Sequence, residues 1–184
     1  MTVFNQAAAA AALDNLSFGP ENLRLARYWL SLWNGDALPL RAAFDPKKAQ
    51  AHLPGLAIFE VKPDESVRCR LFGSALVTAI GKDITGCDWL AMTKEDQRAT
   101  RLFRYSSVAR GAIARCIRRG IDRSGETILT EEIMLPFGDI AEDGTRLVLY
   151  HANWRPVVFE RGTAELSEID GIAAEFQSAP LMAA

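Results

Sequence analysis

Apolar residues recur with two different periods along the chain, and these periods define the elements that we predict. Helical spacing predicts an N-terminal helix between Pro20 and Asn34, and two further helices over 74–80 and 95–110. Alternating or continuous apolar runs predict five strands, which cover 56–61, 67–72, 112–121, 127–137 and 146–154. The strands form a group of two and a group of three with hairpin-length turns inside each group. The pattern therefore predicts an α+β fold with a mostly antiparallel sheet.

The last of these strands carries apolar side chains on both of its faces. Leu147 and Leu149 point to one face, and Val148 and Tyr150 point to the other. A strand that is apolar on both faces needs cover on both faces. We therefore expect the middle helices to cover one face of the sheet and the N-terminal helix to cover the other.

The two ends of the chain differ in composition from this core. Residues 1–20 contain an alanine run and are predicted to be a flexible N-terminal arm. Residues 21–160 are predicted to form one domain that includes the N-terminal helix. Residues 161–184 are predicted to be an acidic C-terminal tail with a weak helix near 164–176, which Pro180 would stop.

Composition narrows the classes of function. The chain has 184 residues, of which 49% are apolar and 24% charged, so it is long enough for one globular core. The formal net charge of −2 gives no strong field toward nucleic acid or a membrane. The three cysteines contain no C-x-x-C pair, and no window approaches the roughly 20 apolar residues that span a bilayer. We therefore expect a cytoplasmic protein.

Short motifs follow this element order along the chain. In order, they are Tyr28-Trp29, Pro39-x-Arg41, Asp45-Pro46, Leu53-Pro54, Arg70-Leu71-Phe72-Gly73, Thr85-Gly86 and Leu135-Pro136. As an ordered set over residues 22–155, they resemble a bacterial family of small, stand-alone PAS-domain proteins. The chain departs from the family pattern at Ser74, where threonine is expected, and at Cys87, where a basic residue usually follows Thr-Gly.

The resemblance implies a five-stranded antiparallel sheet, with helices on one face that enclose a possible small-ligand pocket, and a regulatory or sensory role. Strand 56–61 is then expected in the middle of the sheet, between 67–72 and the last strand, and 127–137 is expected to pair with 146–154. The candidates for lining the pocket are the apolar or small positions of the elements that should converge there. They are Leu71, Leu76, Ile80, Trp89, Leu102, Ser106 and Leu149.

Motifs for catalysis and for the usual PAS cofactors are missing from the sequence. The two histidines, His52 and His151, have no zinc-ligand spacing, and His151 lies in an apolar strand as a hydrogen-bonded core or rim residue would. Haem-binding PAS domains resemble one another in carrying a histidine on the long helix, which here has none. Flavin-binding PAS domains carry a cysteine in a helical Asn-Cys-Arg-type motif, whereas Cys69 follows Arg68 in a strand. We therefore predict no catalytic residue, no metal site and no enzyme, and we leave the cofactor unknown.

Eight arginines lie between residues 98 and 123, with Asp122 as the only acidic residue among them. One interpretation is a surface for an acidic partner protein, an anionic nucleotide or nucleic acid. The other is a solvated helix face and an arginine-rich strand that pairs with Glu131 and Glu132 of the next strand, and it is favoured because surface charge is common. Being adjacent in a strand, these two glutamates should point to opposite faces. The candidates for the surface are Arg98, Arg101, Arg104, Arg115, Arg118 and Arg119.

The N-terminal helix is apolar on more than one face. Its apolar positions are Leu23, Leu25, Ala26, Trp29, Leu30, Leu32 and Trp33. The sheet can cover only one of these faces, and two-fold pairing with a second copy would cover the rest. We predict a homodimer with Leu23, Ala26, Trp29, Leu30 and Trp33 at its interface. The alternative is that segment 36–55 folds back and covers the second face within one chain.

The sequence thus predicts a PAS-type sensory or regulatory domain without a catalytic output of its own, which signals through contact with a small ligand or a partner protein. Two alternatives stay open. One is a protein-interaction module without a ligand, and the other is an anion- or nucleotide-binding regulator that uses the cluster between Arg98 and Arg123.

Overall fold

The structure is a computed structural model that describes residues 4–121, 127–156 and 173–181. A twisted sheet of six strands forms its centre, in the order β2-β1-β5-β4-β3-β6. The strands are β1 (Leu56–Val61), β2 (Val67–Phe72), β3 (Ala112–Ile121), β4 (Thr127–Ile140), β5 (Arg146–Pro156) and β6 (Ala173–Pro180). Every pair of neighbours is antiparallel.

The pairing confirms the predicted arrangement of the first five strands. β1 and β2 form a hairpin, β1 also pairs with β5, and β4 pairs with β5. The sixth strand was not predicted. The weak helix expected near 164–176 is wrong from Ala173 onward, where the chain is extended and pairs with β3, and residues 164–172 lie outside the described residues. Pro180 is tolerated in β6 because β6 is an edge strand.

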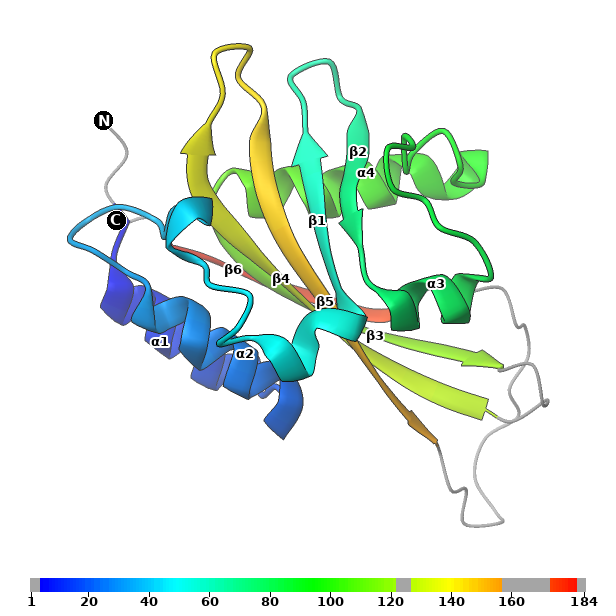
Figure 1. Ribbon diagram of the computed structural model, residues 1–184, viewed down its shortest axis with the longest axis horizontal. Helices are drawn as coiled ribbons and strands as arrows, with labels where there is room; N and C mark the ends of the chain where they lie inside the picture. The colour runs from blue at the N-terminus through cyan, green and yellow to red at the C-terminus, as the bar shows by residue number, and fades with distance from the viewer. Residues whose placement is uncertain (1–3, 122–126, 157–172, 182–184) are drawn as a thin grey trace.

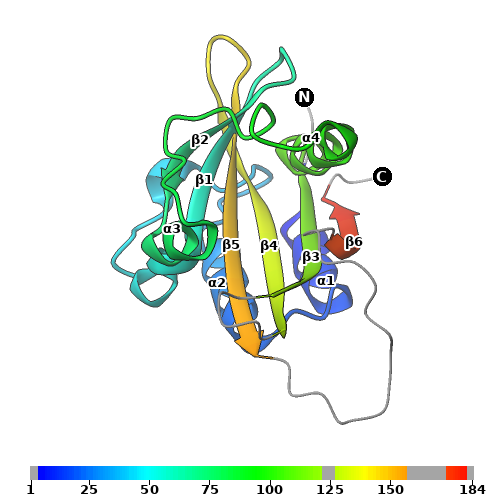
Figure 2. The same ribbon diagram turned by 90° about the vertical axis from the view of Figure 1, so that its right-hand side faces the viewer.

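Helices cover both faces of the sheet, as predicted (Figure 1, Figure 2). The outer face carries α1 (Gln6–Asn15) and α2 (Pro20–Ser31), and the inner face carries α3 (Ser74–Ile80) and α4 (Glu95–Ala109). Two short 3-10 helices, η1 (Arg41–Ala43) and η2 (Gln50–Gly55), lie between α2 and β1. None of the helices in the described part of the chain is long and apolar enough to span a lipid bilayer.

Alternate residues of the central strands pack into two separate hydrophobic cores. On the outer face, Ile58 and Leu149 pack with the buried residues of α1 and α2. On the inner face, Phe59 and Val148 pack with Tyr105 of α4. Each central strand is therefore shared by the two cores, so a shift in the strand affects both.

The predicted flexible arm is wrong over residues 6–15, which form α1. Asn5 caps this helix, because its side-chain oxygen accepts hydrogen bonds from the amides of Ala7 and Ala8 at 2.8 and 3.2 Å. Ala12 and Leu13 are buried in the outer core. Burial of this apolar face, rather than helix propensity alone, holds a segment of ten residues in a helix.

The predicted dimer interface is wrong for Ala26 and Trp29, which are fully buried within the chain. The Trp29 indole N–H donates to the carbonyl of Pro136 at 3.0 Å, and its ring meets Trp33, which is also buried, edge to face. Leu23 and Leu30 are partly buried against the same core. The alternative, in which segment 36–55 covers α2 within one chain, fits the structure, because Tyr28 of α2 packs on Phe44 and bonds to the backbone of Asp45. The unpredicted helix α1 also packs against α2.

Candidate functional site

A cavity of about 160 Å³ lies between the inner face of the sheet and the helices α3 and α4. The sheet lines it with Phe59, Phe72, Arg118, Thr130, Glu132, Tyr150 and Trp154. The helical side lines it with Leu76, Ala79, Ile80, Trp89 and Tyr105. Ala79 and Ile80 are exposed, so the cavity reaches the surface beside α3.

Half of the residues that line the cavity are aromatic. Phe59 on β1 lies at the centre, with ring centroids 4.8 Å from Tyr105 and 5.9 Å from Tyr150 in edge-to-face contacts. The Trp89 ring lies 6.3 Å from Phe59. Edge-to-face packing fixes the ring planes, so the wall is rigid.

The loop that carries Trp89 is tied to the edge strand β2. The amide of Trp89 donates to the carbonyl of Val67 at 2.7 Å, and the amides of Cys69 and Gly86 extend the same ladder. On the far side of the ring, the Arg101 guanidinium stacks 4.3 Å from the ring centroid and bonds to Thr93. The indole is thus held from both sides, yet its buried N–H has no hydrogen-bond partner within the described residues.

A buried ion pair forms the polar end of the cavity. Glu132 Oε1 lies 2.7 Å from Arg118 Nε, and the Glu132 side chain is 4% exposed. The carboxylate raises the pKa of the Arg118 guanidinium, so the guanidinium stays charged. The second carboxylate oxygen, Oε2, is buried and makes no hydrogen bond in the described part of the chain.

The two phenols beside this carboxylate are neutral. Burial, and then the negative charge of Glu132, raise the pKa values of Tyr105 and Tyr150 above the ordinary value. Arg118 alone therefore balances the charge of Glu132, and the cavity lining as a whole is neutral.

Glu131, the neighbour of Glu132, points to the outer face as predicted and is saturated with hydrogen bonds. It accepts from the amide of Gly19 and the side chain of Asn22, each at 2.9 Å, and from Arg115 at 3.1 Å. These bonds fix the N-terminus of α2 to β4. Glu131 therefore has a structural role, whereas Glu132 keeps an open acceptor.

Both histidines lie on the outer side, away from the cavity. His151 is buried, and its Nδ1 lies 2.7 Å from Asn22 Oδ1; because Asn22 donates to Glu131 through its Nδ2, Nδ1 carries the proton. The ring of His52 packs edge to face on His151 at 5.1 Å. Their burial confirms the prediction of a hydrogen-bonded core residue for His151.

The predicted lining residues fall into three groups. Leu76, Ile80 and Trp89 line the cavity. Leu102 packs against the inner core next to it, and Ser106 lines a separate surface groove.

Leu71 and Leu149 were predicted on the wrong face. Leu149 belongs to the outer core, and its neighbour Tyr150 takes the place at the cavity. Leu71 is turned outward because a β-bulge between β1 and β2 shifts the register at Arg70.

Five lining residues that give the cavity its chemistry were not predicted at the pocket, namely Phe59, Tyr105, Arg118, Glu132 and Tyr150. The pairing of the arginine-rich strand with Glu132 was predicted, but not its place at the cavity. An acidic residue in an otherwise apolar strand, opposite an arginine-rich strand, indicates a buried ion pair.

Most of the described arginines of the cluster are engaged within the chain. Arg115 and Arg118 pair with Glu131 and Glu132, as the favoured interpretation predicts. Arg104 stacks on the ring of Phe176, and Arg101 stacks on Trp89. Arg98 is exposed and bonds to a backbone carbonyl, and the side chain of Arg119 lies outside the described residues.

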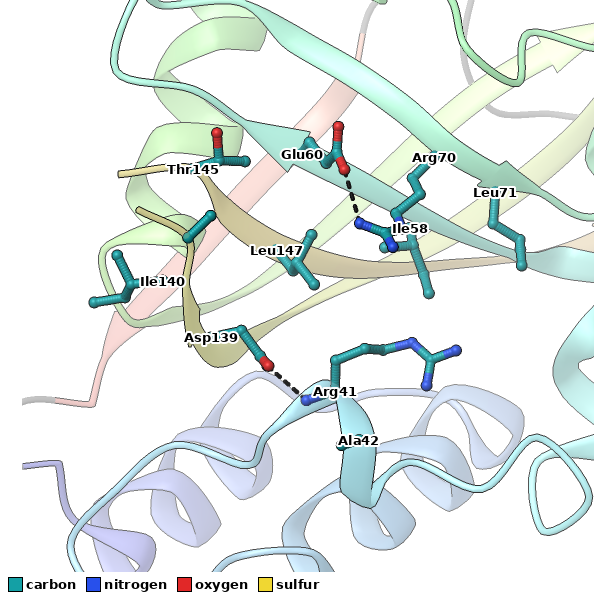
Figure 3. Close-up of a pocket in the computed structure, with 11 residues that line it drawn as sticks. Arg41, Ala42, Ile58, Glu60, Arg70, Leu71, Asp139, Ile140, Thr145 and Leu147 are labelled. Carbon is teal, nitrogen blue, oxygen red and sulfur yellow. Dashed lines mark hydrogen bonds and ion pairs between the residues drawn. The ribbon is translucent and has the colours of Figure 1, made fainter. Parts of the chain in front are cut away.

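A larger groove of about 600 Å³ lies on the outer face, over the parts of β1 and β5 that α1 and α2 leave uncovered (Figure 3). Several of its charged groups are engaged: Arg70 pairs with Glu60 at 2.9 Å, Asp139 accepts the backbone amide of Arg41 at 2.6 Å, and the Arg41 guanidinium lies over the ring of Phe44. The groove is open to solvent, and among its lining residues only the Thr145 hydroxyl is buried without a hydrogen-bond partner in the described part of the chain, whereas the inner cavity holds an unpartnered carboxylate oxygen and an unpartnered indole N–H. The inner cavity is therefore the stronger candidate site despite its smaller volume.

The cavity limits which groups can be held there. A cavity of about 150 Å³ holds a molecule such as benzene, so neither the three-ring system of a flavin nor a haem fits. Burial raises the pKa of the Cys69 thiol to about 12, which keeps it protonated. Among the described residues, no three His, Cys, Asp or Glu side chains are placed to share a metal ion.

The sequence profile described as a PAS domain matches residues 18–149. Three solved structures are similar at low identity. One is a variant named RsLOV d2, at 19% identity with a TM-score of 0.38, covering 60% of this chain and 68% of that one. The light-oxygen-voltage protein of Rhodobacter sphaeroides has 16% identity and a TM-score of 0.38, with the same coverage. The PAS domain of an HTR-like protein from Haloarcula marismortui has 17% identity and a TM-score of 0.35, covering 59% and 90%. No curated protein matches the sequence.

Proposed function

The chain belongs to the PAS domain family, and from this premise we propose that it is a sensory domain that binds a small molecule in the cavity under α3 and α4. The proposal rests on one observation above all: the cavity keeps a buried carboxylate oxygen, Glu132 Oε2, without a hydrogen-bond partner in the described residues. An unpaired buried acceptor costs free energy, and a ligand that donates to it recovers that cost.

A structural change caused by ligand binding would be transmitted through the sheet to its outer face. Phe59 on β1 lines the inner cavity, while its neighbours Ile58 and Glu60 line the outer groove. A ligand that shifts Phe59 therefore moves side chains on the opposite face of the same strand. We propose that the output is a change in contact with a partner protein at this outer face.

The two alternative functions have weaker support. An interaction module without a ligand would have an inner core packed without a cavity. A regulator that binds anions through the arginine cluster would need free guanidinium groups, whereas Arg101, Arg104, Arg115 and Arg118 are engaged within the chain.

The proposal can be tested by closing the cavity mouth. Ala79→Trp places a large ring at the rim, and Thr78→Trp places the same ring on an exposed position of α3 outside the cavity lining. A small-molecule extract of the expressing cells should raise the melting temperature of the wild type and of Thr78→Trp. A ligand present at about 100 times its Kd stabilises by about 2.7 kcal/mol, or about 5–10 °C for a domain of this size.

Ala79→Trp should melt at the same temperature with and without the extract. Native mass spectrometry of the stabilised wild type should show the added mass of the ligand. An extract that raises none of the three melting temperatures, or all three equally, contradicts the proposal.

A further inference from the structure

We infer that the ligand of this cavity is a small, flat, uncharged molecule that donates a hydrogen bond to Glu132 and accepts one from the indole N–H of Trp89. This inference deepens the proposed function and rests on it. Four features of the cavity define the class: its open acceptor, its open donor, its charge balance and its size.

The open acceptor is Glu132 Oε2. A carboxylate that is ionised accepts hydrogen bonds and donates none. Oε1 forms the ion pair with Arg118, and Oε2 has no hydrogen-bond partner in the described residues. The ligand must therefore carry an N–H or O–H group.

The open donor is the indole of Trp89. An indole N–H donates and never accepts, and this one is buried at the cavity without a partner in the described chain. The ligand must therefore also carry a carbonyl oxygen or an unprotonated ring nitrogen. Trp33 also has a buried, unpartnered indole N–H, but it lies in the outer core and provides a matched comparison.

The charge balance and the volume of the cavity further limit the class of ligand. Arg118 already balances Glu132, so a cationic or anionic ligand would bring an uncompensated charge into a buried site. The volume of about 160 Å³ and the aromatic rings of the wall fit a single ring with a short substituent or two small fused rings. The class is thus an aromatic amide, a lactam or a neutral nitrogen heterocycle.

Four compounds of nearly equal shape test these features one at a time. Benzamide has both the donor and the acceptor, and acetophenone keeps only the acceptor. Isopropylbenzene has neither, and benzoate adds a negative charge. Their Kd values for the wild-type protein can be measured by NMR titration.

Benzamide should bind about tenfold or more tightly than acetophenone, since a hydrogen bond to a carboxylate is a strong one. Benzoate should bind at least about tenfold more weakly than benzamide. Trp89→Phe should weaken benzamide and acetophenone by about fivefold and change isopropylbenzene by less than about twofold. Trp33→Phe should change none of the four Kd values.

A second measurement covers the case in which Trp89→Phe does not fold. In the wild type, the indole N–H resonance of Trp89 should shift downfield with benzamide and acetophenone and stay in place with isopropylbenzene.

The outcomes distinguish a failure of the inferred ligand class from a failure of the proposed function as a small-molecule sensor. If isopropylbenzene binds, Ala79→Trp blocks it, and acetophenone binds as tightly as benzamide, the cavity is a ligand site but the inferred ligand class is wrong. The ligand class is also wrong if Trp89→Phe weakens isopropylbenzene as much as the carbonyl compounds. If none of the four binds to the wild type, the ligand class is wrong, and the extract experiment decides the proposed function separately.

Discussion

Glu131 and Glu132 are neighbours in β4, yet they stand on opposite faces of the sheet and differ in their hydrogen bonding. Glu131 receives bonds from α2 and from Arg115, and it secures the outer layer. Glu132 pairs with Arg118 and interacts with the Tyr150 phenol at the lining of the cavity, and its Oε2 has no hydrogen-bond partner of normal geometry among the described residues. Two adjacent residues therefore differ in role: Glu131 holds the outer layer together, and Glu132 belongs to the proposed ligand site.

The His151 side chain should make the stability of the protein depend on pH. Burial, and then the nearby His52, lower its pKa from 6.5 to about 4, so the folded state favours the uncharged ring. Protonation then favours the unfolded chain as the pH falls from about 6.5 toward 4. We expect the free energy of unfolding of the wild type to drop by about 2–3 kcal/mol from this residue between about pH 7 and pH 4.5, measured by urea denaturation.

His151→Gln provides the control for this expectation, since its amide can still donate to Asn22 but does not titrate. The variant should be less stable than the wild type at neutral pH and lose less stability on acidification. Carboxylates away from His151 titrate in both proteins, so their contributions cancel in the difference, whereas the interactions of His151 with His52 and Glu21 are lost in the variant and count as part of the His151 contribution. A variant that loses as much stability as the wild type over this range contradicts the assignment.

Two errors of the sequence analysis show what limits prediction of the site. β5 is apolar at both Leu149 and Tyr150, so alternation alone did not tell which of the two faces the helices. A shift of one residue exchanges the faces of a strand. The outward turn of Leu71 depends on a bulge at Arg70, which is set by pairing with β1 rather than by any local pattern.

At the scale of elements, α1 offers a direct test of the outer layer. Leu13 is 3% exposed in the outer core. Leu13→Ala should lower the free energy of unfolding by about 2–4 kcal/mol, because it removes buried methyl groups and leaves a void. Chemical denaturation followed by tryptophan fluorescence measures this loss, since Trp29 and Trp33 lie in the same core.

Asp14→Ala is the matched control on the exposed side of the same helix, and it should change stability by less than about 0.5 kcal/mol. If residues 1–20 were a flexible arm, both variants would behave alike. Equal stability of the two variants would therefore restore the sequence-based interpretation.

The elements that could be predicted are those with a strong local pattern. The ranges of β1, β2, β3 and α3 agree with the prediction at both ends, because apolar alternation or a glycine marks their limits. α1 and β6 were missed for a common reason. An alanine run has little amphipathic contrast, and Ala173–Pro180 has no clear alternation, so both depend on contacts with distant parts of the chain.

At the scale of the whole molecule, these two missed elements meet. The amide of Asn5 donates to the carbonyl of Leu181 at 3.2 Å, and the amide of Leu181 donates to the carbonyl of Gly111 at 2.9 Å. Phe4 lies directly over Gly111, where an added Cβ would approach the phenyl ring to 2.2 Å. Both ends of the described chain lie outside residues 18–149, which match the PAS profile, and both are anchored at the start of β3.

The contacts at this junction couple the local unfolding of α1 to that of β6. α1 covers α2, and β6 covers the edge of β3, which would otherwise expose unpaired backbone groups. Since the two elements share Leu181 and Gly111, loss of one removes hydrogen bonds from the other. We expect α1 and β6 to unfold together as one cooperative unit rather than to fray independently.

Leu181→Ala tests this cooperative unit. Leu181 is fully buried in the outer core, so the truncation should cost about 2–4 kcal/mol. Native-state hydrogen exchange should then show that the helical amides of α1 and the paired amides of β6 lose protection by the same factor, about 30-fold or more at 2 kcal/mol. Amides of β1 and β5, which lie at the other side of the sheet, should keep more of their protection, because the opening is confined to the ends. Retention of full protection in α1 while β6 exchanges faster would show that the two ends are independent.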